Sequence, residues 1–143
     1  MEFGRLVAQK DEWGCGAACV ASLLRTSYKD AVARLERDKG AGVNEQRNGK
    51  EKGLEPFNIV HVLRVAGYEV TKQSKACSWP LGTIVLLTWR WGRYKKSGHY
   101  MLLTDRGWMD PWYNLNRRPR KAKYRQVLPR RTAVEAALVI RRS

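Results

Sequence analysis

The feature that most constrains this chain is a cysteine set between two glycines, directly before a run of small and apolar residues. Cys15 lies between Gly14 and Gly16, and the segment 17–24 is rich in alanine and other helix formers. Glycine on both sides lets the backbone turn sharply and approach a substrate closely. The pattern predicts a loop that ends at Cys15 and a helix that begins there.

A cysteine at a helix N-terminus has a particular chemistry. The unpaired N–H groups and the positive end of the helix dipole stabilise an anion, so a thiol placed there ionises more readily and becomes a better nucleophile. Gln9, six residues upstream, can project its amide towards the same point as an oxyanion donor. The alternative is a structural cysteine in a buried helix, as most free cysteines are. Cys19 follows Cys15 by one helical turn, which predicts core packing.

The length and the cysteine count limit the class of protein. A chain of 143 residues suits one domain over 1–143. An odd number of cysteines argues against a disulfide framework and for a reducing compartment, so a cytoplasmic location is expected, with delivery to another compartment left open. Cys15, Cys19 and the distant Cys77 make a poor zinc site, and neither a metal nor a cofactor is expected. No membrane-spanning segment or secretory signal is visible.

The strongest feature of the composition is its charge. There are 28 Lys and Arg against 13 Asp and Glu, a net charge of +15. Such a field attracts acidic partners, whether nucleic acid, an anionic membrane or an acidic protein. A solvated surface that keeps the protein soluble is the alternative. Basic residues are especially dense after Arg117.

The first half of the chain is expected to be helical. After the helix at 15–25, a second helix should occupy 27–40, where Ser27 and an acid three residues later resemble a capping box. The polar, glycine-rich segment 39–53 predicts a loop. A third helix should run over 56–67, from a proline to a glycine, with one apolar stripe.

The second half is expected to be a sheet. Residues 68–71 alternate as a strand does, and 84–87 is a continuous apolar run typical of a central strand. Segments 98–104 and 108–110 predict a hairpin. Residues 133–142 are ambiguous between helix and strand, and their run of three branched apolar residues favours a final strand.

The register of the predicted hairpin decides whether His99 and Asp110 meet. If Asp105 and Arg106 form a two-residue turn, Asp110 is a diagonal neighbour of His99 on one face. A three-residue turn would separate them. In the first case the carboxylate can hold the imidazole in one tautomer while the ring faces a cysteine from elsewhere. The other histidine, His61, lies off the apolar stripe of the third helix and is expected at the surface.

These residues together resemble a known family. Gln9, the segment 14–19, the segment 98–103 and the pair 110–111 resemble the peptidases that remove double-glycine leader peptides from bacteriocins. The resemblance covers about residues 7–112. It implies an α+β, papain-like cysteine peptidase fold. Helices at about 14–67 would pack on an antiparallel sheet at about 68–143.

The same resemblance implies roles for four residues. Cys15 would be the nucleophile and His99 the general base and later acid. Asp110 would orient the histidine. Gln9, with the backbone N–H of Cys15, would form the oxyanion hole. Members of the family usually have an aspartate where this chain has Gly14.

The expected function is that of a cysteine peptidase or a related thiol acyl-transfer hydrolase. It would cleave a peptide or isopeptide bond after small or glycine residues in an acidic partner. The family usually precedes an exporter, for which 143 residues leave no room, so a free-standing domain is expected and leader processing is not implied. A deamidase or transferase remains an alternative. The alternative from another class is a basic nucleic-acid-binding protein on an inactive papain-like scaffold. Its support is the charge and the aromatic and cationic residues of segment 89–96.

Overall fold

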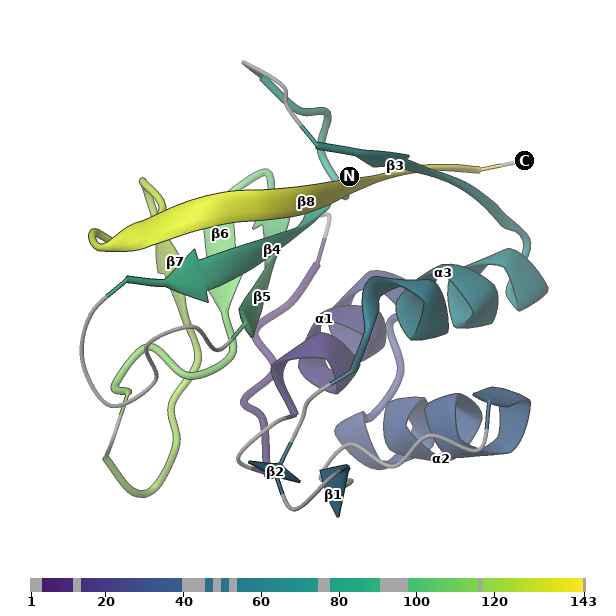
Figure 1. Ribbon diagram of the computed structural model, residues 1–143, viewed down its shortest axis with the longest axis horizontal. Helices are drawn as coiled ribbons and strands as arrows, with labels where there is room; N and C mark the ends of the chain where they lie inside the picture. The colour runs from purple at the N-terminus through teal and green to yellow at the C-terminus, as the bar shows by residue number, and fades with distance from the viewer. Residues whose placement is uncertain are drawn as a thin grey trace.

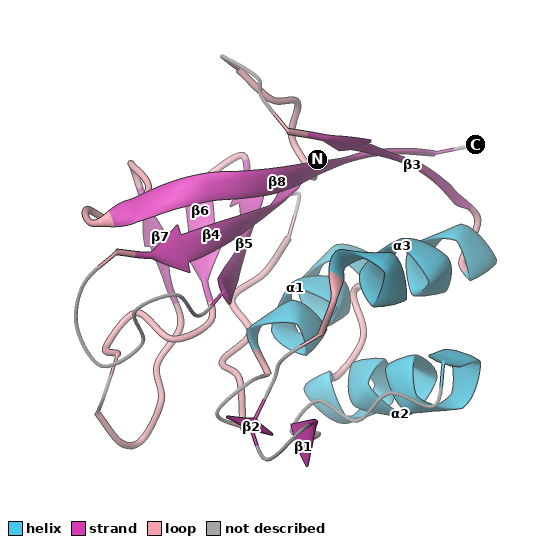
Figure 2. Ribbon diagram, viewed as in Figure 1, coloured by secondary structure: helices cyan, strands magenta, loops and turns pink. Residues whose placement is uncertain are grey.

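The computed structural model has a helical part followed by a sheet, as Figure 2 shows. It describes residues 4–11, 14–39, 46–47, 50–51, 54–74, 78–90, 98–115 and 117–142. Within these ranges no helix is long and apolar enough to cross a membrane. The elements are α1 (Cys15–Leu24), α2 (Tyr28–Lys39), β1 (Gln46–Arg47), β2 (Lys50–Glu51), α3 (Pro56–Val65), β3 (Tyr68–Gln73), β4 (Ile84–Trp89), β5 (Gly98–Thr104), β6 (Gly107–Asp110), β7 (Lys123–Arg125) and β8 (Thr132–Arg142).

The main sheet has six strands in the order β3-β8-β4-β5-β6-β7, and every neighbouring pair is antiparallel. The last strand, β8, lies between β3 and β4, so the strand expected at 133–142 is confirmed. The short β7 was not predicted, because three residues give no periodic signal and the strand depends on pairing with β6.

The loop expected at 39–53 contains a small hairpin, so the expectation was wrong for four residues. Strands β1 and β2 pair with Arg47 opposite Lys50. The sequence between them is Asn-Gly, a dipeptide typical of two-residue hairpin turns, and this is the signal that would have predicted it.

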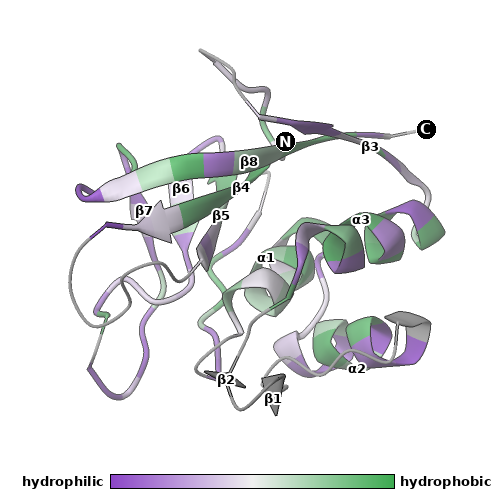
Figure 3. Ribbon diagram, viewed as in Figure 1, coloured by the Kyte–Doolittle hydropathy of each residue, from purple (hydrophilic) through white to green (hydrophobic). Residues whose placement is uncertain are grey.

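The helices form two layers on one face of the sheet. Helix α1 packs against β5 and α3 against β3, while α2 packs on α1 and α3 (Figure 1). Along α2 and α3, hydrophobic and hydrophilic residues alternate, as Figure 3 shows. Successive strand residues point to opposite faces. One face of the central strands therefore supplies Ile84, Leu102 and Leu138 to the core beneath the helices.

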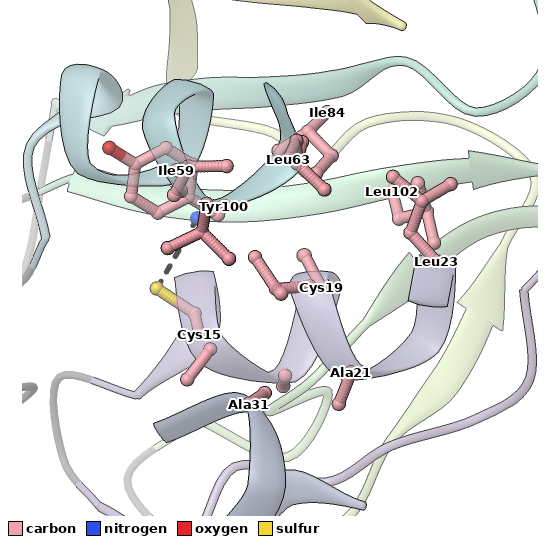
Figure 4. Close-up of a cluster of buried hydrophobic side chains, with 14 of the residues drawn as sticks. Cys15, Cys19, Ala21, Leu23, Ala31, Ile59, Leu63, Ile84, Tyr100 and Leu102 are labelled. Carbon is pink, nitrogen blue, oxygen red and sulfur yellow. Dashed lines mark hydrogen bonds between the residues drawn. The ribbon is translucent and has the colours of Figure 1, made fainter. Parts of the chain in front are cut away.

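Small side chains let α1 sit close to its neighbours. Ala17, Ala18 and Ala21 are fully buried, and Cys19 lies in the core as predicted. Figure 4 shows Cys19 and Ala21 on α1 with side chains of the surrounding elements around them. The start of α2 also agrees with its predicted cap, because Ser27 Oγ accepts a hydrogen bond from the Asp30 N–H at 3.0 Å.

The β5–β6 hairpin has the two-residue turn on which the site depends. Thr104 pairs with Gly107 and Leu102 with Met109, which confirms the predicted register. Gly107 has a φ of +117°, and a Cβ there would lie 2.5 Å from the carbonyl oxygen of Arg125. Glycine therefore allows both the turn and the close approach of β7.

Candidate active site

Cys15 is the first residue of α1, and Gly14 is its N-cap, with no side-chain capping bond. The Cys15 Sγ accepts a hydrogen bond from the backbone N–H of Tyr100 at 3.4 Å, drawn in Figure 4. The side chain of Tyr100 is anchored separately, because its hydroxyl donates to the carbonyl of Leu54 at 2.7 Å. Residue 15 is 6% exposed. The strand β5 thus places a backbone hydrogen-bond donor at the sulfur.

His99 and Asp110 form a buried pair on the hairpin. Their side chains lie 2.8 Å apart, from His99 Nε2 to Asp110 Oδ1, and the residues are 4% and 1% exposed. This leaves Nδ1 as the ring nitrogen that can face Cys15, whose side chain is close enough to raise the pKa of His99. The three side chains therefore form one series, Cys15–His99–Asp110, although the first is 84 residues from the second in sequence.

The electrostatics of the pair favour its charged form. Burial lowers the pKa of His99, but the charge and hydrogen bond of Asp110, together with Cys15, raise it to about 10. Burial raises the pKa of Asp110, whereas the charge of His99 and the hydrogen bonds it accepts lower it to about 2. At neutral pH, His99 is therefore a cation next to Cys15. A cation in that place stabilises a thiolate.

Two residues that complete this site were not found from the sequence. Arg125 on β7 donates from Nε to Asp110 Oδ2 at 2.7 Å, and the backbone N–H of Trp112 donates to Asp110 Oδ1 at 3.0 Å. Asp110 thus accepts hydrogen bonds from three groups. No sequence pattern pointed to Arg125, because its strand is short and only the fold brings it to Asp110.

The loop before α1 brings Gln9 to the same region. Gln9 is 2% exposed, and its backbone N–H donates to the carbonyl of Pro111 at 3.2 Å, directly after Asp110. Gln9 Nε2 donates to the carbonyl of Asp11 at 3.0 Å, and the N–H of Gly14 donates to the same oxygen at 3.1 Å. One carbonyl thus links the amide of Gln9 to Gly14, the residue before Cys15. The first N–H groups of a helix have no intrahelical acceptor, so an oxyanion can use them.

The position of Tyr28 explains why a glycine precedes Cys15. Its hydroxyl donates to Asp11 Oδ2 at 2.8 Å, and burial and this bond raise its pKa. A Cβ built on Gly14 would lie 1.9 Å from the Tyr28 hydroxyl oxygen. The phenol therefore fills the space that any side chain at residue 14 would need. This is where the family that the sequence resembles usually has an aspartate.

We expect Gly14→Ala to destabilise the protein by about 1–3 kcal/mol, because the new methyl group overlaps the Tyr28 hydroxyl. Tyr28→Phe alone should cost about 1–2 kcal/mol through the lost hydrogen bond to Asp11. The double variant should lose less than the sum of the two, by about 1 kcal/mol, since phenylalanine removes the 1.9 Å contact with the hydroxyl and leaves the ring carbon Cζ at 3.0 Å. Urea unfolding measures all three. Strict additivity would contradict the overlap.

The other sequence candidates lie elsewhere or outside the described ranges. Cys19 is fully buried, and burial raises the pKa of its thiol well above the usual value, which suits a core residue. His61 is partly buried on α3. Cys77 and segment 91–97 lie outside the described residues. Among the described residues, no group of three or more His, Cys, Asp or Glu side chains is placed to hold a metal ion.

Of three comparisons with known proteins, the one with solved structures found a protein of similar fold. No protein-family model matches the sequence, and no curated protein matches it. Among solved structures, the peptidase domain of Streptococcus ComA, a bifunctional ABC transporter involved in a quorum-sensing pathway, is similar with a TM-score of 0.56. The match covers 97% of this chain and 98% of that domain at 15% identity. This chain therefore has an α+β, papain-like peptidase fold, three helices packed on a six-stranded antiparallel sheet.

Proposed function

We propose that this chain is a cysteine peptidase with Cys15 as nucleophile, His99 as acid and base, Asp110 as the group that orients His99, and Gln9 in the oxyanion hole. The observation that carries the proposal is the buried His99–Asp110 pair, hydrogen-bonded at 2.8 Å, beside a Cys15 that starts α1 and accepts a hydrogen bond from the backbone N–H of Tyr100, the residue after His99. The peptidase-like scaffold supports it, as does the donor that Tyr100 offers to the sulfur.

In the proposed mechanism the reaction begins with Cys15 as a thiolate and His99 protonated, and this sets the order of the proton transfers. The Cys15 thiolate attacks the carbonyl carbon, and the oxyanion accepts hydrogen bonds from the Gln9 amide and the Cys15 N–H. The C–N bond then breaks, and His99 gives its proton to the leaving amine. A water molecule passes a proton to His99 and attacks the thioester. The carboxylic acid leaves, and Cys15 becomes a thiolate beside a protonated His99 again.

The substrate proposed is a peptide or isopeptide with a small or glycine residue before the cleaved bond. Support comes from the resemblance of the sequence to the double-glycine peptidases. The same acyl chemistry also serves a deamidase or a transferase, and product analysis separates these reactions.

Incubation with a mixed peptide library, followed by mass spectrometry of the products, tests the proposal. We expect hydrolysed products with glycine or alanine enriched before the cleaved bond, and none from Cys15→Ala, because no other group supplies the nucleophile. His61→Ala is the matched control and should retain the products. Products that persist in Cys15→Ala would rule out the mechanism. Deamidated but uncleaved peptides would identify the alternative reaction.

Nucleic-acid binding is not favoured by a specific observation. Trp89 packs with its ring centroid 5.9 Å from that of His99, which makes it a neighbour of the catalytic pair. The other aromatic residues of segment 89–96, Trp91 and Tyr94, lie outside the described residues. A single-stranded oligonucleotide is therefore one of the ligands to be tested for protection of Cys15.

A further inference from the structure

A cluster of cations surrounds two aromatic rings directly after the Asp110 of the candidate site. The guanidinium carbons of Arg118 and Arg120 lie 4.9 and 4.7 Å from the ring centroid of Trp112. Cations over an aromatic face are attracted by its electron density. Beside Trp112, the ring of Tyr113 has a cation at 5.1 Å and another at 4.4 Å, from Lys123 and Arg125. We call these six residues the cationic cluster: Trp112, Tyr113, Arg118, Arg120, Lys123 and Arg125.

The cationic cluster contacts the candidate site at two places, at Asp110 and at the loop that contains Gln9. On one side Arg125 and the N–H of Trp112 bond to the carboxylate of Asp110. On the other side Arg120 Nη1 donates to the carbonyl of Lys10 at 3.0 Å, next to Gln9 in sequence. Figure 1 shows the long connection from β6 to β7 beyond the end of the sheet where α1 also begins. A peptide held in the site would therefore lie close to these cations.

Within the part of the chain that the structure describes, most of this charge has no anionic partner. Among the described residues, Arg125 alone in the cluster contacts a carboxylate. Arg118 and Lys123 are exposed, and so are the neighbouring Arg117 and Lys121. Because the rings already hold the cations in place, an incoming anion would order fewer side chains on binding.

The geometry favours an acidic peptide over a nucleic acid as the ligand of the cationic cluster. Trp112 is 2% exposed and has two guanidinium groups over its ring, so it offers no free face for base stacking. A guanidinium stacked on a ring keeps the N–H groups at its edge, and these bind carboxylates in bidentate fashion. The ligand that fits is the acidic side chain of a peptide.

We propose that the cationic cluster binds acidic side chains of the peptide substrate and so selects acidic substrates. The inference rests on the proposed function, since it needs a peptide in the site of Cys15. It adds the chemistry of a second recognition surface, which the catalytic residues do not specify.

The test compares two fluorescein-labelled peptides, one alternating glutamate with glycine and one with glutamine in place of every glutamate. Fluorescence anisotropy measures binding, and site-resolved mass spectrometry measures how far each peptide protects Cys15 from iodoacetamide. The variant is Arg118→Gln with Lys123→Gln. Its matched control is Lys29→Gln with Lys72→Gln, which removes the same charge from exposed positions on α2 and β3.

We expect the glutamate peptide, and not the glutamine peptide, to bind and to protect Cys15 from iodoacetamide. Its affinity should fall roughly threefold to tenfold in the cluster variant and remain close to that of the unmodified protein in the control, since each exposed pair contributes modestly. An equal loss of affinity in the cluster variant and in the control would show that only the net charge of the protein matters, and this would overturn the proposal. So would binding without protection of Cys15, or protection by a single-stranded oligonucleotide but not by the peptide. Failure of the proposed function would instead show as a Cys15 that is unreactive at neutral pH without any peptide.

Discussion

Replacing His99 with alanine will slow the alkylation of Cys15 by iodoacetamide most strongly in mild acid, by roughly 10- to 100-fold at about pH 5.5. The raised pKa of His99, about 10, keeps the ring cationic throughout this range, so it can hold Cys15 as a thiolate. An unassisted thiol titrates near about pH 8.5 and is almost entirely protonated there.

The matched control for this experiment is the other histidine. His61→Ala removes a ring from α3 and should leave the alkylation rate of Cys15 unchanged at each pH. Mass spectrometry assigns the label to Cys15, Cys19 or Cys77 in each protein. If His99→Ala and His61→Ala label Cys15 at the same rate in mild acid, His99 does not activate the thiol and the catalytic proposal fails.

Asp110→Ala should cost about 3–5 kcal/mol of unfolding free energy at neutral pH, the largest loss of stability expected from a single change in the site. The substitution leaves three groups without their acceptor: the buried His99 ring, the Arg125 guanidinium and the backbone N–H of Trp112. Asp110→Asn should lose less, because its amide oxygen still accepts a hydrogen bond. Urea unfolding measures the losses. Glu36→Ala, on the exposed side of α2, is the control and should change stability by less than about 0.5 kcal/mol.

The loss of unfolding free energy caused by Asp110→Ala should become smaller both towards strong acid and towards strong alkali. The pKa of Asp110 falls to about 2 on folding, so its contribution is present above about pH 4 and disappears as the pH falls through about 2. The pKa of His99 rises to about 10, so its contribution is complete below about pH 6.5 and is lost as the pH rises through about 10. The difference between the two proteins should be largest at about pH 4–6.5. A difference that stays constant from mild acid to strong alkali would contradict the ion pair.

The parts of the site that follow local rules were predictable. The glycines around Cys15 and the alanines after it predicted the start of α1, and the two-residue turn predicted that His99 and Asp110 meet. Arg125 was not predictable, because it reaches Asp110 from a strand that exists through pairing with β6. Tyr28 was not predictable either, because its position over Gly14 depends on the packing of α2 against α1.

The sequence by itself determined most of the helices and strands and which of their side chains share a face, because helix caps, turns and hydrophobic periodicity act over a few residues. It thereby placed Cys15 at a helix start and paired His99 with Asp110. Only the tertiary structure decided that Cys15 meets the His99–Asp110 pair. Cys15 and His99 are 84 residues apart in sequence, so their contact depends on how α1 packs against β5. It also decided the electrostatics, because the pKa values of His99 and Asp110 follow from burial and from neighbours that are distant in sequence.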